Sequence, residues 1–79
     1  MTNYEKYLNV FTKMFSVSED DAVDLEYQGI PDWDSVGHME LVATIEETFD
    51  IMMDTDDIID FSSFEKGKEI LSNNYSIEF

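Results

Sequence analysis

A chain of 79 residues with 19 acidic and four basic side chains carries a formal charge of −15, and this excludes several classes of function. Nucleic-acid binding needs Lys and Arg to displace counterions from phosphates, and anionic membrane surfaces repel so acidic a chain. The absence of cysteine excludes a disulfide, a thiolate metal site and a cysteine nucleophile. We therefore expect one small domain, residues 1–79, whose partners are proteins with basic surfaces.

The first expected helix covers about residues 3–15. Thr2 and Glu5 have the spacing of a capping box, in which each side chain bonds the other residue's backbone N–H. Apolar side chains then recur at steps of three and four residues, as on one face of a helix. They are Tyr4, Tyr7, Leu8, Phe11, Met14 and Phe15. An aromatic stripe of this kind is more typical of a core than of a ligand site, so we assign it to the core.

A connection at about residues 16–34 follows, which is long for so small a domain. Ser18 and the acidic residues after it favour one short helical turn within this segment. Trp33, near its end, is expected to bury its ring and to anchor the chain as it enters the next helix. The length of the connection permits either antiparallel or crossed packing of the helices that it joins.

Helical periodicity returns at about residues 35–49, behind a turn. The inward stripe is Leu41, Val42, Ile45 and Phe49, with His38 among them. The outward face carries Ser35, Val36, Met39, Glu40, Ala43, Glu46 and Glu47. Ser35 begins the helix, where we expect its oxygen to accept a hydrogen bond from a free backbone N–H. A face that mixes apolar groups with carboxylates suits a partner with a basic rim.

Two further helices are expected at about residues 55–61 and 63–73, the first of them short. Ser62 and Glu65 repeat the capping-box spacing at the start of the last helix. The fold class that follows is all-α: a four-helix bundle with a short third helix and a long loop between the first two helices.

Two glycines fall inside expected helices, where each costs up to about 1 kcal/mol relative to Ala. Gly37 either clears the approach to Ser35 or is simply tolerated. Gly67 is expected to weaken the interior of the last helix.

The stretch around Ser35 resembles the acyl carrier protein family over about twenty residues. Three segments carry the resemblance: Asp34-Ser35-Val36, Met39-Glu40-Leu41-Val42 and Ile45-Glu46-Glu47-Thr48-Phe49-Asp50-Ile51. They are similar to the Asp-Ser-Leu motif that heads the family's second helix, and to the Glu-Leu-Val and Leu-Glu-Glu-x-Phe-x-Ile runs that complete it. The Trp-Asp-Ser start and the Gly-His after the motif are closer to stand-alone carriers of specialised pathways. Lys68 departs from the family, which usually has an apolar residue there.

The resemblance implies a carrier rather than an enzyme. Ser35 would bear a covalent 4′-phosphopantetheine arm, on which acyl or aminoacyl intermediates of fatty-acid or secondary-metabolite biosynthesis are held as thioesters. Asp34 would orient the coenzyme or contact the modifying transferase. Family positions that face partners correspond to Val36, Met39, Glu40 and Glu47, with Glu46 beside them. The implied partners are a phosphopantetheinyl transferase, a loading ligase and acyl-transfer enzymes with basic surfaces.

Other interpretations stay open beside the carrier. An acidic adaptor with the same fold would never be modified, and an aminoacyl or peptidyl carrier of non-ribosomal synthesis would differ only in its cargo. Asp34, Ser35 and His38 invite a serine hydrolase. That activity needs a base aligned on the hydroxyl, an acid behind the imidazole and an oxyanion hole. His38 is expected to point toward the core and Asp34 precedes the helix, so the hydrolase is the weakest interpretation.

Features that the sequence lacks bear on metal binding, membrane insertion and cellular location. A calcium loop needs an oxygen ligand at position five, a glycine at six and a glutamate at twelve. Counted from Asp32, the fifth residue is Val36 and the twelfth is Ala43; counted from Asp54, the fifth and sixth are Ile58 and Ile59, so we expect no dedicated metal site. No apolar run approaches the ~20 residues of a membrane span, and the N-terminus lacks the layout of a signal peptide. We expect a cytoplasmic monomer.

Overall fold

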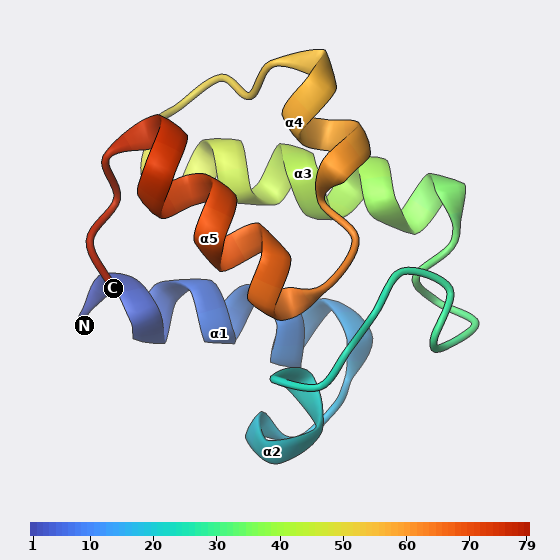
Figure 1. Cartoon of the computed structure of the whole chain (residues 1–79). Helices are drawn as coiled ribbons and strands as arrows, with labels where there is room; N and C mark the ends of the chain where they lie inside the picture. The colour runs from blue at the N-terminus through green and yellow to red at the C-terminus, as the bar shows by residue number, and fades with distance from the viewer.

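The structure, a computed structural model, describes residues 1–79 as five helices with no strand, which confirms the all-α class. The helices are α1 (Asn3–Phe15), α2 (Glu19–Ala22), α3 (Ser35–Phe49), α4 (Thr55–Asp60) and α5 (Phe64–Tyr75). α1 and α3 pack on each other and run in opposite directions, and α5 passes in front of both in the view of Figure 1. α2 packs on α1, and α4 packs on α5. No helix has both the length and the apolarity needed to cross a bilayer.

The start of α1 follows its capping signal, but the start of α5 does not. Thr2 accepts a hydrogen bond from the N–H of Glu5 at 3.1 Å, and Glu5 accepts one from the N–H of Thr2 at 3.0 Å, so the expected capping box is present. The expected box from Ser62 is wrong. Ser63 begins α5 instead, with its hydroxyl accepting from the N–H of Lys66 at 2.9 Å. Because the cap lies one residue later than expected, the residue three positions after it is Lys66 and not Glu65. A lysine cannot accept the return hydrogen bond of a capping box.

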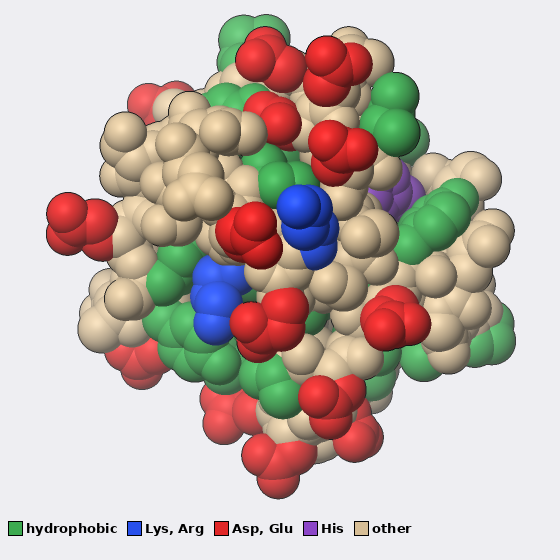
Figure 2. Space-filling model, viewed as in Figure 1, with side chains coloured by type: hydrophobic (Ala, Val, Ile, Leu, Met, Phe, Trp, Pro, Cys, Tyr) green, Lys and Arg blue, Asp and Glu red, His purple; other side chains and the backbone are tan.

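The core is built largely from aromatic rings. The largest side chains with at most 1% exposure are Trp33, Tyr7, Phe11, Phe61 and Phe64. Phe11 lies at the centre, with ring centroids 4.9 Å from Phe64 and 5.6 Å from Trp33. No charged side chain is buried, so the carboxylates all lie at the surface, and Figure 2 shows them spread over the visible face. Burial of these large rings offsets the repulsion between surface charges of one sign.

The contact between α5 and α1 depends on Gly67. This glycine is buried, and a Cβ there would overlap the ring of Phe61 and the hydroxyl of Tyr7. That hydroxyl donates a hydrogen bond to the carbonyl of Phe64 at 2.7 Å. The expectation that Gly67 only weakens α5 therefore needs correction, because the missing side chain admits two aromatic groups. Lys68 also has partners, since its Nζ lies 3.4 Å from a Glu65 carboxylate oxygen.

Gly67→Ala should destabilise the protein by about 1–3 kcal/mol, because overpacking outweighs the gain of about 1 kcal/mol in helix propensity. Asn73→Ala, at an exposed position of the same helix, should stay within about 0.5 kcal/mol of the wild type. Urea denaturation measures both. A stabilised Gly67→Ala protein would contradict the close packing described here.

Burial raises the pKa of the Tyr7 hydroxyl well above its usual range, and the charges of Glu65 and Tyr4 add to the effect. In the unfolded chain this hydroxyl ionises near pH 10, whereas in the folded protein it stays neutral. The stability it contributes is therefore complete below about pH 10 and is lost as the pH rises toward the folded pKa.

We expect Tyr7→Phe to be about 1 kcal/mol less stable than the wild type at pH 8, through loss of the hydrogen bond. Between pH 10 and 11 this difference should shrink, because only the wild type loses stability through Tyr7. Urea denaturation across this range gives the difference directly, and a constant gap would speak against a neutral, buried hydroxyl.

Candidate functional site

Ser35 is the first residue of α3, and its side chain is exposed. The cap is made by the residue before it, since Oδ1 of Asp34 accepts a hydrogen bond from the N–H of Gly37 at 2.8 Å. The expectation that Ser35 caps the helix is therefore wrong. Only a residue in extended conformation outside the helix can turn its side chain back onto the first N–H groups, and Asp34 is that residue. As a result, the Ser35 hydroxyl is not occupied by the backbone.

Three hydrogen-bonding groups are available at this end of α3. Oγ of Ser35 lies 3.2 Å from the hydroxyl oxygen of Tyr27, which is its one side-chain partner. The backbone N–H groups of Ser35 and Val36 donate to no protein atom. They lie at the positive end of the α3 dipole, where an anionic substituent on the serine oxygen would be stabilised.

Gly37 lets the chain turn tightly into α3. A Cβ at this position would overlap the carbonyl oxygen of Asp32, on the segment that leads to the helix. Neither sequence-based explanation, a cleared approach to Ser35 or a tolerated glycine, identified this contact. The glycine is required by the backbone that places Asp34 at the cap.

Trp33 and His38 fix that approach segment to two helices. The Trp33 ring is fully buried, as expected, and its Nε1 donates a hydrogen bond to Nδ1 of His38 at 3.0 Å. An indole N–H can only donate, so Nδ1 accepts and Nε2 carries the proton. Nε2 then donates to the carbonyl of Ile58 in α4 at 2.8 Å. Both ring nitrogens are occupied, and neither is bonded to Ser35, so the residues of the hydrolase interpretation do not form a triad.

A hollow of about 380 Å³ lies beside Ser35, between α3 and α4. Besides the serine, its lining includes Tyr27, His38, Met39, Ile58 and Ile59. Ile59 is 71% exposed and Met39 is 56% exposed, so the rim is apolar. Sequence reasoning assigned Met39 to the site but missed Tyr27 and the two isoleucines. No periodicity could have found them, because they lie on a turn and on a short helix that only the tertiary fold brings to Ser35.

The outward face of α3 carries most of the expected partner-facing residues. Val36 is 68% exposed, and both Glu40 and Glu47 are exposed. Glu46 differs from this expectation. It is half-buried, and its carboxylate accepts a hydrogen bond from the N–H of Met53 at 2.8 Å. The role of Glu46 in the structure is therefore to hold the segment after α3, and the acidic outward face is carried by Glu40 and Glu47.

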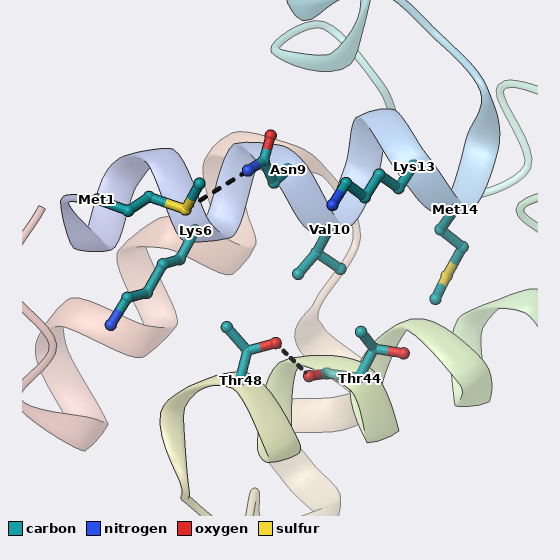
Figure 3. Close-up of a pocket in the computed structure, with 8 residues that line it drawn as sticks. All are labelled: Met1, Lys6, Asn9, Val10, Lys13, Met14, Thr44 and Thr48. Carbon is teal, nitrogen blue, oxygen red and sulfur yellow. Dashed lines mark hydrogen bonds between the residues drawn. The ribbon is translucent and has the colours of Figure 1, made fainter.

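A second hollow, of about 470 Å³, separates α1 from the other side of α3 (Figure 3). Val10 and Met14 of α1 extend toward Thr44 and Thr48 of α3 across this hollow. Lys6 and Lys13 also line it, and they form no ion pair, unlike the two lysines of α5. The α1 side of this hollow thus carries positive charge, whereas the outward face of α3 carries negative charge. A basic protein surface is favoured on the outward face and opposed at α1.

The acidic residues at the start of α4 have local partners. The two carboxylate oxygens of Asp57 accept hydrogen bonds from Asn74 at 3.0 Å and from the hydroxyl of Tyr75 at 2.7 Å. Partial burial is the main reason that the pKa of Tyr75 is raised. No group of three or more His, Asp or Glu side chains is arranged to hold a metal ion.

Comparison of the chain with protein-family models, with curated proteins and with solved structures gives no match in any of the three. The functional interpretation therefore rests on the residues and the geometry around Ser35.

His38→Ala should destabilise the protein by about 1–3 kcal/mol, because it leaves the Trp33 N–H buried without an acceptor. Thr44→Ala, on the same helix and away from Trp33, serves as the control and should cost much less. Unfolding followed by Trp33 fluorescence, the chain's single tryptophan, measures both. Equal costs for the two variants would show that the bond between Trp33 and His38 contributes little.

Proposed function

We propose that the chain is a carrier protein that bears a 4′-phosphopantetheine arm on Ser35 and delivers acyl or aminoacyl intermediates to partner enzymes. One observation carries the proposal. The serine at the tip of α3 is exposed, and its hydroxyl bonds no backbone group because Asp34 performs the capping. A serine kept for structure would be expected to spend its oxygen on the backbone, as Ser18 and Ser63 do at other helix starts.

The residues around Ser35 fit such an arm. A phosphodiester on Oγ is an anion, and the free N–H groups of Ser35 and Val36 can donate to it. The adjoining hollow offers an apolar surface at Met39 and Ile59 and a hydroxyl at Tyr27, which suits a chain of alternating methylene and amide groups. When bound, the arm supplies the thiol on which cargo is held as a thioester, and the chain itself has no cysteine to do so.

The remaining residues would guide partners rather than react. Asp34 caps α3 and so fixes the helix start that the transferase would contact. Glu40 and Glu47 attract basic surfaces to the outward face of α3. Val36 and Met39 add apolar area that becomes buried on docking. Because the arm is tethered, each encounter between cargo and enzyme occurs at a raised effective concentration.

The proposed fold type, location and partners are those of an acyl carrier protein. α1, α3, α4 and α5 would form a four-helix bundle of the acyl carrier type, with α2 inside the long connection between the first two bundle helices. The protein would act as a cytoplasmic monomer that meets a phosphopantetheinyl transferase, a loading ligase and acyl-transfer enzymes. The chain would catalyse no step.

Incubation with coenzyme A and a broad-specificity phosphopantetheinyl transferase tests the proposal. We expect the intact mass to rise by one phosphopantetheine in the wild type and not in Ser35→Ala. No gain in the wild type would favour the unmodified acidic adaptor. Ester hydrolysis by the unmodified protein, lost in Ser35→Ala, would favour the hydrolase.

Reversing the charges of Glu40 and Glu47 together to Lys should slow modification about tenfold at low salt, with a smaller effect at high salt, because steering is screened. Glu19→Lys with Asp20→Lys, two exposed positions of α2, changes the net charge equally and is the matched control. We expect the control to lose much less. Equal rates for the two double variants would mean that the total charge matters and that the outward face of α3 has no special role.

A further inference from the structure

Tyr27 is the one side chain that hydrogen-bonds the Ser35 hydroxyl, at 3.2 Å between the two oxygens. The two residues are eight positions apart, on different elements of the structure. Each hydroxyl can donate and accept, so the contact can work in either direction. Without it, the Ser35 side chain would have no protein partner and would be free to change rotamer.

The tyrosine is held in place by groups other than Ser35. Its backbone N–H donates to the carbonyl of Ser62 at 2.8 Å, in the segment between α4 and α5. Its ring lies edge-on to His38, with centroids 5.2 Å apart, and edge-on to Trp33 at 6.5 Å. These rings are themselves fixed by the hydrogen bond between Trp33 and His38. The Tyr27 hydroxyl is therefore a fixed point from which the mobile serine side chain can be oriented.

Two hollows adjoin the start of α3, and they differ in their relation to Ser35. The smaller one, of about 270 Å³, is lined by Asp34, Val36 and Glu40 among others, but not by Ser35. The larger one contains both Ser35 and Tyr27. A serine oxygen held by Tyr27 thus faces the hollow between α3 and α4, so a substituent on that oxygen would leave on that side.

We propose that Tyr27 is a positioning residue for Ser35, an inference that rests on the proposed carrier function. Before modification its hydroxyl holds Oγ in one rotamer. After modification it donates a hydrogen bond to the phosphodiester, which can only accept. The side of α3 on which the arm leaves is set by this contact.

The group transfer that this orientation serves is a phosphoryl substitution. A bond forms between Oγ of Ser35 and the phosphorus next to the pantetheine of coenzyme A. The bond from that phosphorus to the bridging oxygen breaks, and adenosine 3′,5′-bisphosphate leaves. The hydroxyl proton passes to a base of the transferase. A fixed rotamer favours this step because the attacking oxygen starts near its reactive position.

Tyr27→Phe keeps the ring against His38 and Trp33 and removes only the hydroxyl. Tyr4→Phe is the matched control, because the Tyr4 hydroxyl makes no hydrogen bond. Loss of one partly exposed hydrogen bond corresponds to a fall of about three- to tenfold in kcat for modification. The KM for coenzyme A and the urea midpoint should match those of the control.

A second readout does not depend on the rate. In the modified proteins, the ³¹P resonance of the phosphodiester should differ between Tyr27→Phe and Tyr4→Phe, because one of its hydrogen-bond donors is gone. A kcat within twofold of the control, or an unchanged ³¹P resonance, would overturn the role of Tyr27. Failure of the wild type to accept the arm would instead overturn the carrier function, so the two failures are distinguishable.

Discussion

The burial of Trp33 is the constraint on which the site depends. Its ring packs among the core aromatics, stacked on Phe15 at 5.5 Å, and its N–H is satisfied by His38. An indole placed in this way fixes the backbone two residues before Ser35. Asp34 then falls at the cap and Ser35 falls on the exposed first turn. Displacement of this ring would disturb the cap, the serine and the position of Tyr27 together.

Repulsion between surface charges destabilises this fold, and packing of the core stabilises it. Nineteen carboxylates on a chain of this size repel one another, and only two ion pairs, both at the surface, reduce that repulsion. Surface pairs of this kind contribute little to stability. The opposing contribution comes from close packing of large rings, which Gly67 makes possible by leaving room for Phe61 and Tyr7. The acidity therefore has a cost in stability, which is consistent with a use in attracting basic partners.

Much of the fold was predictable from the sequence. Periodic apolar residues and the cap at Thr2 set the bounds of α1, and the stripe of Leu41, Val42 and Ile45 set those of α3. The two cap errors are local, because the caps are made by Asp34 and Ser63, the neighbours of the expected Ser35 and Ser62. The other errors arose where tertiary contacts decide. Gly67 looked like a weak point because the hydroxyl of Tyr7 approaches it from a distant part of the chain, whereas the group that approaches Gly37 is the nearby carbonyl of Asp32.

The candidate site was predictable only in part, for the same reason. Ser35 and the outward carboxylates Glu40 and Glu47 lie on one helix, so their spacing places them together. Tyr27 and Ile59 come to the serine through the packing of Trp33 and His38, and no local pattern records that. Glu46 has the periodicity of the outward residues, but its carboxylate accepts a hydrogen bond from the backbone N–H of Met53.

The two chain ends meet at the opposite end of α3 from the serine. The side chain of Asn3 donates to the carbonyl of Glu78 at 3.1 Å, and the ring of Phe79 lies 6.3 Å from that of Phe49, the last residue of α3. Figure 1 places both termini beside the start of α1. Ser35 is about 20 Å away along the helix axis. A tag, a surface linkage or a fused domain at either terminus would thus leave the serine open to large visiting proteins.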